Sequence, residues 1–163
     1  MSRLFATFFY VGRLRPAPGT WGSAAAIPPA WLIDRLGGPW LLSAAALCAF
    51  LLGWWAAARE AARTGVSDAP EIVIDEVAGM WVALLPVAFG AAAAGVPAAA
   101  LWPGWVAAFL LFRLFDIWKP GPIRRADRMG TPLGVMLDDL VAGGFAAFGV
   151  VVAAGLWHGL LAL

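Results

Sequence analysis

The residues best suited to chemistry are acidic side chains that stand at the borders of long apolar runs. Five of the ten acidic residues occupy such borders, where an ionised carboxylate is costly to keep. They form two adjacent pairs and one single residue: Asp75 with Glu76, Asp138 with Asp139, and Asp116. A divalent cation relieves both the burial cost and the repulsion within a pair, because Mg²⁺ prefers carboxylate oxygens. One pair alone is explained as well by helix capping, but three sets together favour a metal site with one or two ions.

A turn rich in small residues offers a complementary site for an anion. Pro18 and Gly19 are followed by Thr20, Gly22 and Ser23, just before an apolar segment. Small residues let backbone N–H groups approach a phosphate, and the hydroxyls add hydrogen-bond donors. The turn lacks the Gly-Lys-Ser/Thr ending of a Walker A loop, and a simple proline-directed turn would also explain it.

Basic residues surround the single acid of the third set. Arg113 and Lys119 stand three residues before and after Asp116, close enough on a helix to share its face. The segment 119–128 carries four basic residues, including Arg124. Such a loop can also serve simply to touch anionic lipid headgroups. Carboxylates, cations and a glycine turn at one membrane face together indicate phosphoryl transfer chemistry on a lipid headgroup.

The composition identifies the elements that must position these residues as membrane helices. The chain has 163 residues, of which 63% are hydrophobic and 13% charged, and its mean hydropathy is +0.83. A soluble domain carries about a quarter charged residues, so a soluble monomer is excluded. The net charge of +1 shows no basic excess, and we expect no nucleic-acid partner. The single cysteine, Cys48, excludes a disulfide framework and a thiolate metal cluster.

Charge-free runs mark the membrane spans. A crossing helix needs about 20 apolar residues. The middle run is too long for one crossing, and glycines and prolines near residues 95–104 divide it into spans at 77–94 and 102–117. A weaker segment at 20–36, interrupted by prolines, is expected to be a kinked or re-entrant first span. The three runs without any Asp, Glu, Lys or Arg are 36–58, 77–112 and 140–163.

These spans predict an all-α, polytopic membrane helical bundle, a single domain over residues 1–163. With about five membrane-embedded helices, ten of the eleven basic residues lie on one side and only Arg35 lies on the other. The positive-inside rule makes the basic side cytoplasmic. The three acid sets lie on that side, so we expect short cytoplasmic loops to form the site.

Four sequence blocks resemble the signature blocks of the phosphatidylglycerophosphatase A family. They are RPAPGTWGS, EIVIDEVAGMW, FRLFDIWKPGPIRRADR and LGVMLDDLVAG, and the resemblance runs from about residue 12 to residue 144. It implies a Mg²⁺-dependent enzyme of the bacterial inner membrane. Such an enzyme removes the terminal phosphate of phosphatidylglycerophosphate to give phosphatidylglycerol in phospholipid biosynthesis. Its partners would be this lipid and the membrane, and the sequence does not indicate an oligomeric state.

The resemblance also assigns roles residue by residue. The five acids named above match the family's two acidic doublets and the acid of its FDxxKP block, which implies catalytic and metal-binding roles. The chain departs from the family at Thr131 and Pro132, where two glycines are usual, and this leaves the shape of that loop open. The residues that match phosphate-binding positions are Thr20, Ser23, Arg113, Lys119 and Arg124.

Alternative functions are weighed by what the chain lacks. Cys48 lies within a span, a single histidine cannot supply a histidine-nucleophile phosphatase, and no Asp-x-Asp motif occurs. We therefore expect a water activated by the metal to attack phosphorus, although an Asp nucleophile stays open. The competing class is a divalent-cation channel or transporter lined by the same carboxylates. The basic segment beside the acids would repel a permeating cation and argues against that class.

Overall fold

The structure is a computed structural model that describes residues 1–67 and 69–161, with side chains as far as residue 157. No strand occurs in these described residues, so the all-α prediction is confirmed. The last two residues of the predicted span 140–163 lie outside them. The elements are α1 (Ser2–Ala6), η1 (Val11–Arg13), α2 (Pro18–Thr64), α3 (Ile74–Ala94), η2 (Ala98–Leu101), α4 (Trp102–Trp118), α5 (Pro122–Asp127) and α6 (Pro132–Leu161).

Four helical stretches are long and apolar enough to cross a membrane: Pro18–Thr64, Ile74–Ala94, Ala98–Trp118 and Pro132–Trp157. The chain is therefore a multi-pass membrane protein. The predicted break near residue 95 is confirmed, because Gly95 ends α3 in the left-handed conformation, with φ of 66°.

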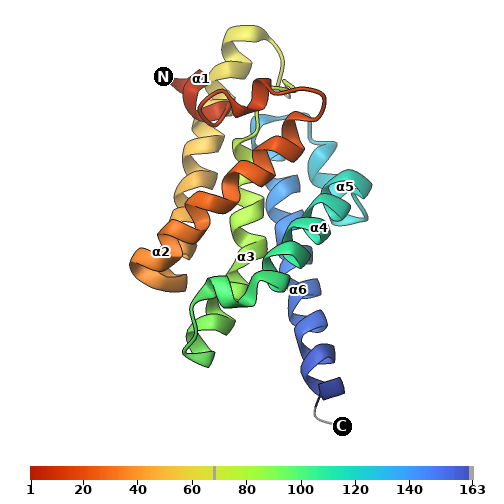
Figure 1. Ribbon diagram of the computed structural model, residues 1–163. Coiled ribbons are helices and arrows are strands. Elements are labelled where there is room, and N and C mark those ends of the chain that lie inside the picture. Colours follow the sequence, from red (N-terminus) through yellow and green to blue (C-terminus); the bar gives the residue numbers. More distant parts are fainter. Residues whose placement is uncertain (68, 162–163) are drawn as a thin grey trace.

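The first of these stretches, α2, is folded back on itself. Gly38 has φ of 69° and ψ of −168° inside it, a conformation that essentially only glycine adopts. Figure 1 shows the chain descending to this bend and then returning, so that α2 consists of two arms. The two arms correspond to the predicted segments 20–36 and 36–58. With α3, α4 and α6 they give five helical segments, and the prediction of about five embedded helices is confirmed.

Helix α3 is the central element of the bundle. It passes between the arms of α2, α4 and α6 (Figure 1), and Val77, Met80 and Leu84 on it are fully buried. The indole N–H of Trp81 donates a hydrogen bond to the carbonyl oxygen of Ala26 at 2.8 Å, which ties α3 to the first arm of α2. Many of the buried positions are alanines, and small side chains let helices pack closely in lipid.

The outer surface is strongly apolar. Leu36, Trp40, Ile117 and Phe148 are each more than 70% exposed, although their side chains are large and hydrophobic. A soluble monomer rarely exposes so many contiguous apolar groups, whereas lipid tails solvate them without cost. This surface confirms the expectation of a membrane protein.

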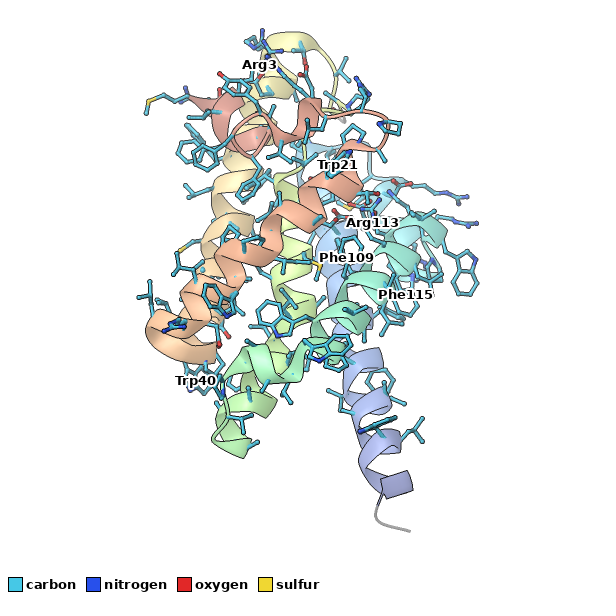
Figure 2. All side chains as sticks on the ribbon, viewed as in Figure 1. Arg3, Trp21, Trp40, Phe109, Arg113 and Phe115 are labelled. Carbon is cyan, nitrogen blue, oxygen red and sulfur yellow. The ribbon has the colours of Figure 1, made fainter. Side chains whose placement is uncertain are left out.

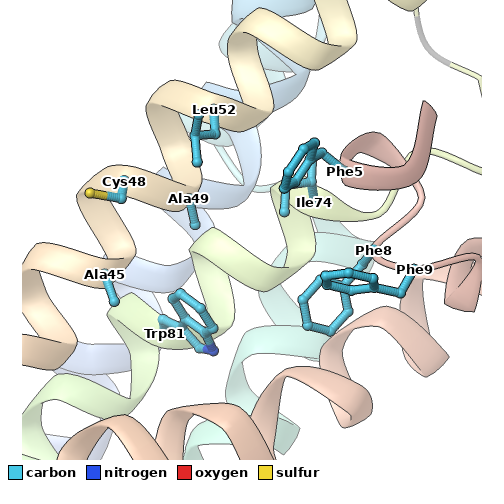
Figure 3. A pocket seen from close by; sticks show the side chains of 9 residues that line it. All are labelled: Phe5, Phe8, Phe9, Ala45, Cys48, Ala49, Leu52, Ile74 and Trp81. Atoms are coloured by element: carbon cyan, nitrogen blue, oxygen red, sulfur yellow. The ribbon is translucent and has the colours of Figure 1, made fainter. Parts of the chain in front are cut away.

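An apolar pocket of about 270 Å³ lies between the second arm of α2, α3 and the N-terminal segment. Its walls come from α1, the segment after it, and the two helices, as Figure 3 shows for Phe5, Phe8, Ala49, Ile74 and Trp81. None of its lining residues is ionisable other than Cys48, so this pocket offers nothing to bind a phosphate.

The order of the helices brings distant acids to one end of the bundle. The starts of α2, α3 and α6 lie toward the same end, and α4 ends near them (Figure 1). The bend at Gly38 and the connection between α3 and α4 lie toward the opposite end. The three acid sets are therefore neighbours in space, although they are separated by up to 64 positions in the sequence.

Candidate metal and phosphate site

Three carboxylates from two helices form a close cluster at this end of the bundle. Asp75 and Glu76 belong to the first turn of α3, and Asp139 belongs to α6. One oxygen from each of the three lies within 4.8 Å of the others. Asp75 and Asp139 are buried, whereas Glu76 is half-buried. The three side chains define what we call the acidic cluster.

A close contact between two glycines sets the spacing of the acidic cluster. A Cβ atom added to Gly143 of α6 would overlap the carbonyl oxygen of Gly79 on α3. A Cβ atom added to Gly79 would lie 2.5 Å from the carbonyl oxygen of Asp139. Asp75 precedes Gly79, and Asp139 precedes Gly143, by four residues, which is about one helical turn on the same face. Because α3 and α6 run in the same direction (Figure 1), the glycine contact places the two acids side by side.

The residues of the acidic cluster fit a divalent cation. Oε2 of Glu76 and Oδ2 of Asp139 are buried and have no hydrogen-bond partner among the described residues. An unpaired buried carboxylate oxygen is strongly unfavourable, and the three neighbouring carboxylates also repel one another when ionised. Oxygen donors at this spacing suit a hard ion such as Mg²⁺ or Mn²⁺.

Asp116 lies at the edge of the acidic cluster. Its Oδ2 atom is 2.6 Å from Nη1 of Arg113, three residues earlier on α4, as the sequence predicted. The carboxyl groups of Asp139 and Glu76 both interact electrostatically with Asp116. Asp116 therefore interacts both with the carboxylates of the acidic cluster and with the guanidinium of Arg113.

Asp138 lies outside the close set of three carboxylates and pairs with a cation. Nζ of Lys119 donates hydrogen bonds to Oδ2 of Asp138 at 2.6 Å and to Oδ1 of Asp127 at 2.5 Å. Burial by itself would lower the pKa of Lys119, but these two carboxylates raise it above its usual range, so that Lys119 stays protonated. The structure thus pairs Asp138 with a cation and does not bring it into the close set with Asp139. Sequence reasoning did not identify Asp127, three positions after Arg124, as the second partner of Lys119.

The predicted turn at the start of α2 contacts the acidic cluster directly. A Cβ atom added to Gly19 would overlap Oε1 of Glu76 and would lie 3.2 Å from Nη1 of Arg113. Nη1 of Arg113 also donates to Oγ of Ser23 at 3.4 Å, and that hydroxyl in turn donates to the carbonyl oxygen of Gly19 at 2.8 Å. Figure 2 shows Arg113 reaching from α4 toward the start of α2. Thr20 is half-buried on the same turn.

The buried face of Arg113 has hydrogen-bonding capacity to spare. Its Nε atom is buried and has no hydrogen-bond partner among the described residues. A guanidinium group offers five donors in a planar fork that matches a phosphate. Arg113 is therefore the cation best placed to hold an anion beside the acidic cluster.

Arg124 lies in a different place from the other predicted phosphate-binding residues. It is exposed on α5 and lines a surface hollow together with Trp118, Arg125 and Arg128. Among the predicted set, the structure brings Ser23 and Arg113 to the acidic cluster, whereas Lys119 contacts Asp138. The glycines that position the cluster were missed, although the spacing of four residues in both Asp75-to-Gly79 and Asp139-to-Gly143 could have revealed them.

Comparison of the sequence with known proteins identifies a family. The family model described as Phosphatidylglycerophosphatase A matches residues 4–154. A Haemophilus influenzae protein named Phosphatidylglycerophosphatase A is 40% identical over 156 residues, which cover 94% of this chain and 88% of that protein. An Escherichia coli protein of the same name is 39% identical over 158 residues, covering 95% of this chain and 80% of that protein. No solved structure gives a significant match to the chain.

Proposed function

The chain belongs to the phosphatidylglycerophosphatase A family, and we propose that it is a membrane phosphatase that hydrolyses phosphatidylglycerophosphate to phosphatidylglycerol and phosphate. One observation carries the proposal. Carboxylate oxygens of Asp75, Glu76 and Asp139 converge within 4.8 Å beside the guanidinium of Arg113, at one end of a membrane helix bundle. This arrangement suits a phosphate group presented at the surface of the bilayer.

Mg²⁺ is the proposed cofactor, and the acidic cluster would hold it. When bound there, the ion would polarise the phosphoryl group and make an attacking water more acidic. The two unpaired oxygens, Oε2 of Glu76 and Oδ2 of Asp139, support the assignment because they need a positive partner. Asp116, which interacts with Asp139, would complete the negative environment.

The chain's own residues would bind the phosphate and move the proton. Arg113 has an unused Nε donor and lies close to the backbone of Gly19, so it would orient the phosphate and balance its developing charge. Asp116 would hold Arg113 in place through their ion pair. Glu76 is the half-buried member of the acidic cluster, and its carboxylate, through the oxygen that does not hold the ion, would accept the proton of the attacking water.

The same features favour a particular location. We propose that the end carrying the acidic cluster faces the cytoplasm of a bacterial inner membrane. The basic residues of α5 and of the segment before α2 gather toward this end, as the positive-inside rule requires. The acyl chains of the substrate would stay in the bilayer, so only the headgroup would enter the site.

Phosphate release from the detergent-purified protein tests the proposal. With phosphatidylglycerophosphate and Mg²⁺ we expect hydrolysis, and EDTA should stop it. Asp75→Asn and Asp139→Asn should abolish turnover without changing expression. Asp34→Asn is the matched control, because Asp34 lies near the bend of α2 at the opposite end of the bundle.

Two outcomes would overturn the proposal. Turnover that survives EDTA would exclude a role for a metal ion in the reaction. Near-normal turnover in both Asn variants would exclude a catalytic role for the acidic cluster. If no phosphate is released but divalent ions cross liposomes that contain the protein, the alternative of a cation channel or transporter would replace the phosphatase.

A further inference from the structure

A surface hollow beside α5 concentrates positive charge outside the acidic cluster. It has a volume of about 410 Å³. Its lining includes three arginines and no acidic residue, and we call it the α5 pocket. The residues that line it are Trp118, Pro120, Gly121, Arg124, Arg125 and Arg128.

The arginines of the α5 pocket differ from most other cations of the protein in lacking a carboxylate partner. Arg3, Arg63, Arg113 and Lys119 each form an ion pair within 4.0 Å. In the described part of the chain, no such ion pair involves the three arginines of the pocket. Three guanidinium groups around one hollow repel each other, and an anion placed among them would remove that repulsion.

The pocket is built on a fixed frame. Ile123 and Ala126 are the buried side of α5, and this leaves the arginines on its exposed side. Lys119 ties α5 to α6, because its ammonium group forms ion pairs with both Asp127 of α5 and Asp138 of α6. These buried apolar contacts and the two ion pairs of Lys119 fix the position of α5, and the exposed arginines are therefore held near one another.

The surroundings of the pocket indicate a lipid. Trp118 is 62% exposed, and Ile117 beside it and Leu114, about one turn earlier on α4, are also exposed apolar residues. An exposed tryptophan at the end of a membrane helix is typical of the interface between headgroups and acyl chains. A phospholipid bound here could place its phosphate among the arginines and its acyl chains along α4. Arginine forks bind phosphate in a two-pronged fashion that other anions match less well.

We infer that the α5 pocket binds the phosphate group of an anionic phospholipid whose acyl chains lie against α4. The inference rests on the placement of α4 in the membrane and does not depend on hydrolysis at the acidic cluster. It therefore can fail or hold independently of the proposed function. The bound lipid is either the substrate, through its phosphodiester, or a second anionic lipid, and both present the same phosphate chemistry.

Lipid binding to the purified protein tests the inference. Wild type in mixed micelles is titrated with radiolabelled phosphatidylglycerol and, separately, with phosphatidylcholine, and the bound lipid is counted after gel filtration. We expect preferential binding of phosphatidylglycerol, reduced on the order of tenfold or more in Arg125→Gln/Arg128→Gln, since two charge-assisted hydrogen bonds are lost. Arg15→Gln/Arg59→Gln removes the same charge from exposed positions outside the pocket and should bind like wild type.

Further arms separate the sources of the phosphate and guard against misfolding. Inorganic phosphate at the same concentration should not displace the lipid, and displacement would mean that the pocket binds free phosphate instead. Competition by phosphatidylglycerophosphate in the inactive Asp139→Asn background shows whether the substrate itself occupies the pocket or a second lipid does. The single variant Arg128→Gln, altered just beyond the end of α5, should show a partial loss. Equal binding of phosphatidylglycerol to wild type and both pocket variants would overturn the inference.

Discussion

Substitution of Gly79 by alanine would separate the two helices that carry the acidic cluster. The added Cβ would lie 2.5 Å from the carbonyl oxygen of Asp139, about 0.9 Å short of the 3.4 Å at which ordinary contact begins. The rigid ring of Phe112, at 2.7 Å, blocks a shift to the other side. Helix α6 must therefore move by close to 1 Å, and Asp139 moves with it.

A displacement of this size is large compared with the tolerance of the proposed metal site. Mg²⁺ requires oxygens at about 2.0–2.1 Å in near-octahedral geometry. A misplacement of about 1 Å at a reacting centre can lower the rate by about 10²-fold. We expect kcat/KM of Gly79→Ala to fall by roughly that factor, and Gly143→Ala to behave similarly because its Cβ would overlap Gly79. Overpacking also costs about 1–3 kcal/mol of stability, so the melting temperature should fall moderately.

The assay is steady-state phosphate release in detergent, together with Mn²⁺ binding and thermal unfolding of each variant. Gly144→Ala is the matched control on the same helix, since an added Cβ there meets nothing within 4 Å. It should keep wild-type activity and affinity. If folded Gly79→Ala and Gly143→Ala both keep wild-type turnover, the glycine contact does not set the geometry of the site. A loss of turnover with unchanged Mn²⁺ affinity would also refute the reasoning.

Three further predictions concern neighbours of the acidic cluster. Asp138→Asn should retain Mn²⁺ affinity, whereas Asp139→Asn should lose it, and equal loss in both would contradict the different surroundings of the two acids. Lys119→Met should lower thermal stability by about 1–2 kcal/mol, since its half-exposed ion pairs are partly screened. The pKa of Lys119 is raised in the folded protein, so its contribution to the free energy of unfolding is fully present below the unfolded-state pKa of about 10.4. That contribution is lost only as the pH rises through the higher folded pKa. Thermal melts at neutral and at mildly alkaline pH should therefore show the same difference in stability between wild type and Lys119→Met. Trp81→Phe should cost about 1 kcal/mol by removing the hydrogen bond to Ala26 while leaving turnover unchanged, as paired melts and activity assays would show.

Much of the fold could be predicted because lipid imposes simple requirements on a sequence. Charge-free runs gave spans at 77–94 and 102–117, and α3 and α4 begin and end within a few residues of these bounds. The order of the spans then predicted that the three acid sets lie at one end of the bundle, where the structure places them. That two arms form a single bent element at Gly38 depends on backbone angles, and hydropathy carries no information about them.

The details of the site depend on helix rotation and register, which the sequence pattern does not settle. Adjacent residues on a helix point about 100° apart, so a doublet in the sequence does not say whether one or both of its members face the same neighbour. The structure turns Asp139 toward Asp75 and leaves Asp138 to Lys119. Arg124 was predicted to bind phosphate because of its position in a motif, but in the structure it lines the α5 pocket.

Binding of Mn²⁺ to the purified protein, followed by electron paramagnetic resonance, shows whether the three carboxylates of the acidic cluster share an ion. We expect saturable binding by wild type that is lost in Asp75→Asn, Glu76→Gln and Asp139→Asn and kept in Asp34→Asn. Unchanged Mn²⁺ binding in the three cluster variants would show that these carboxylates do not share an ion.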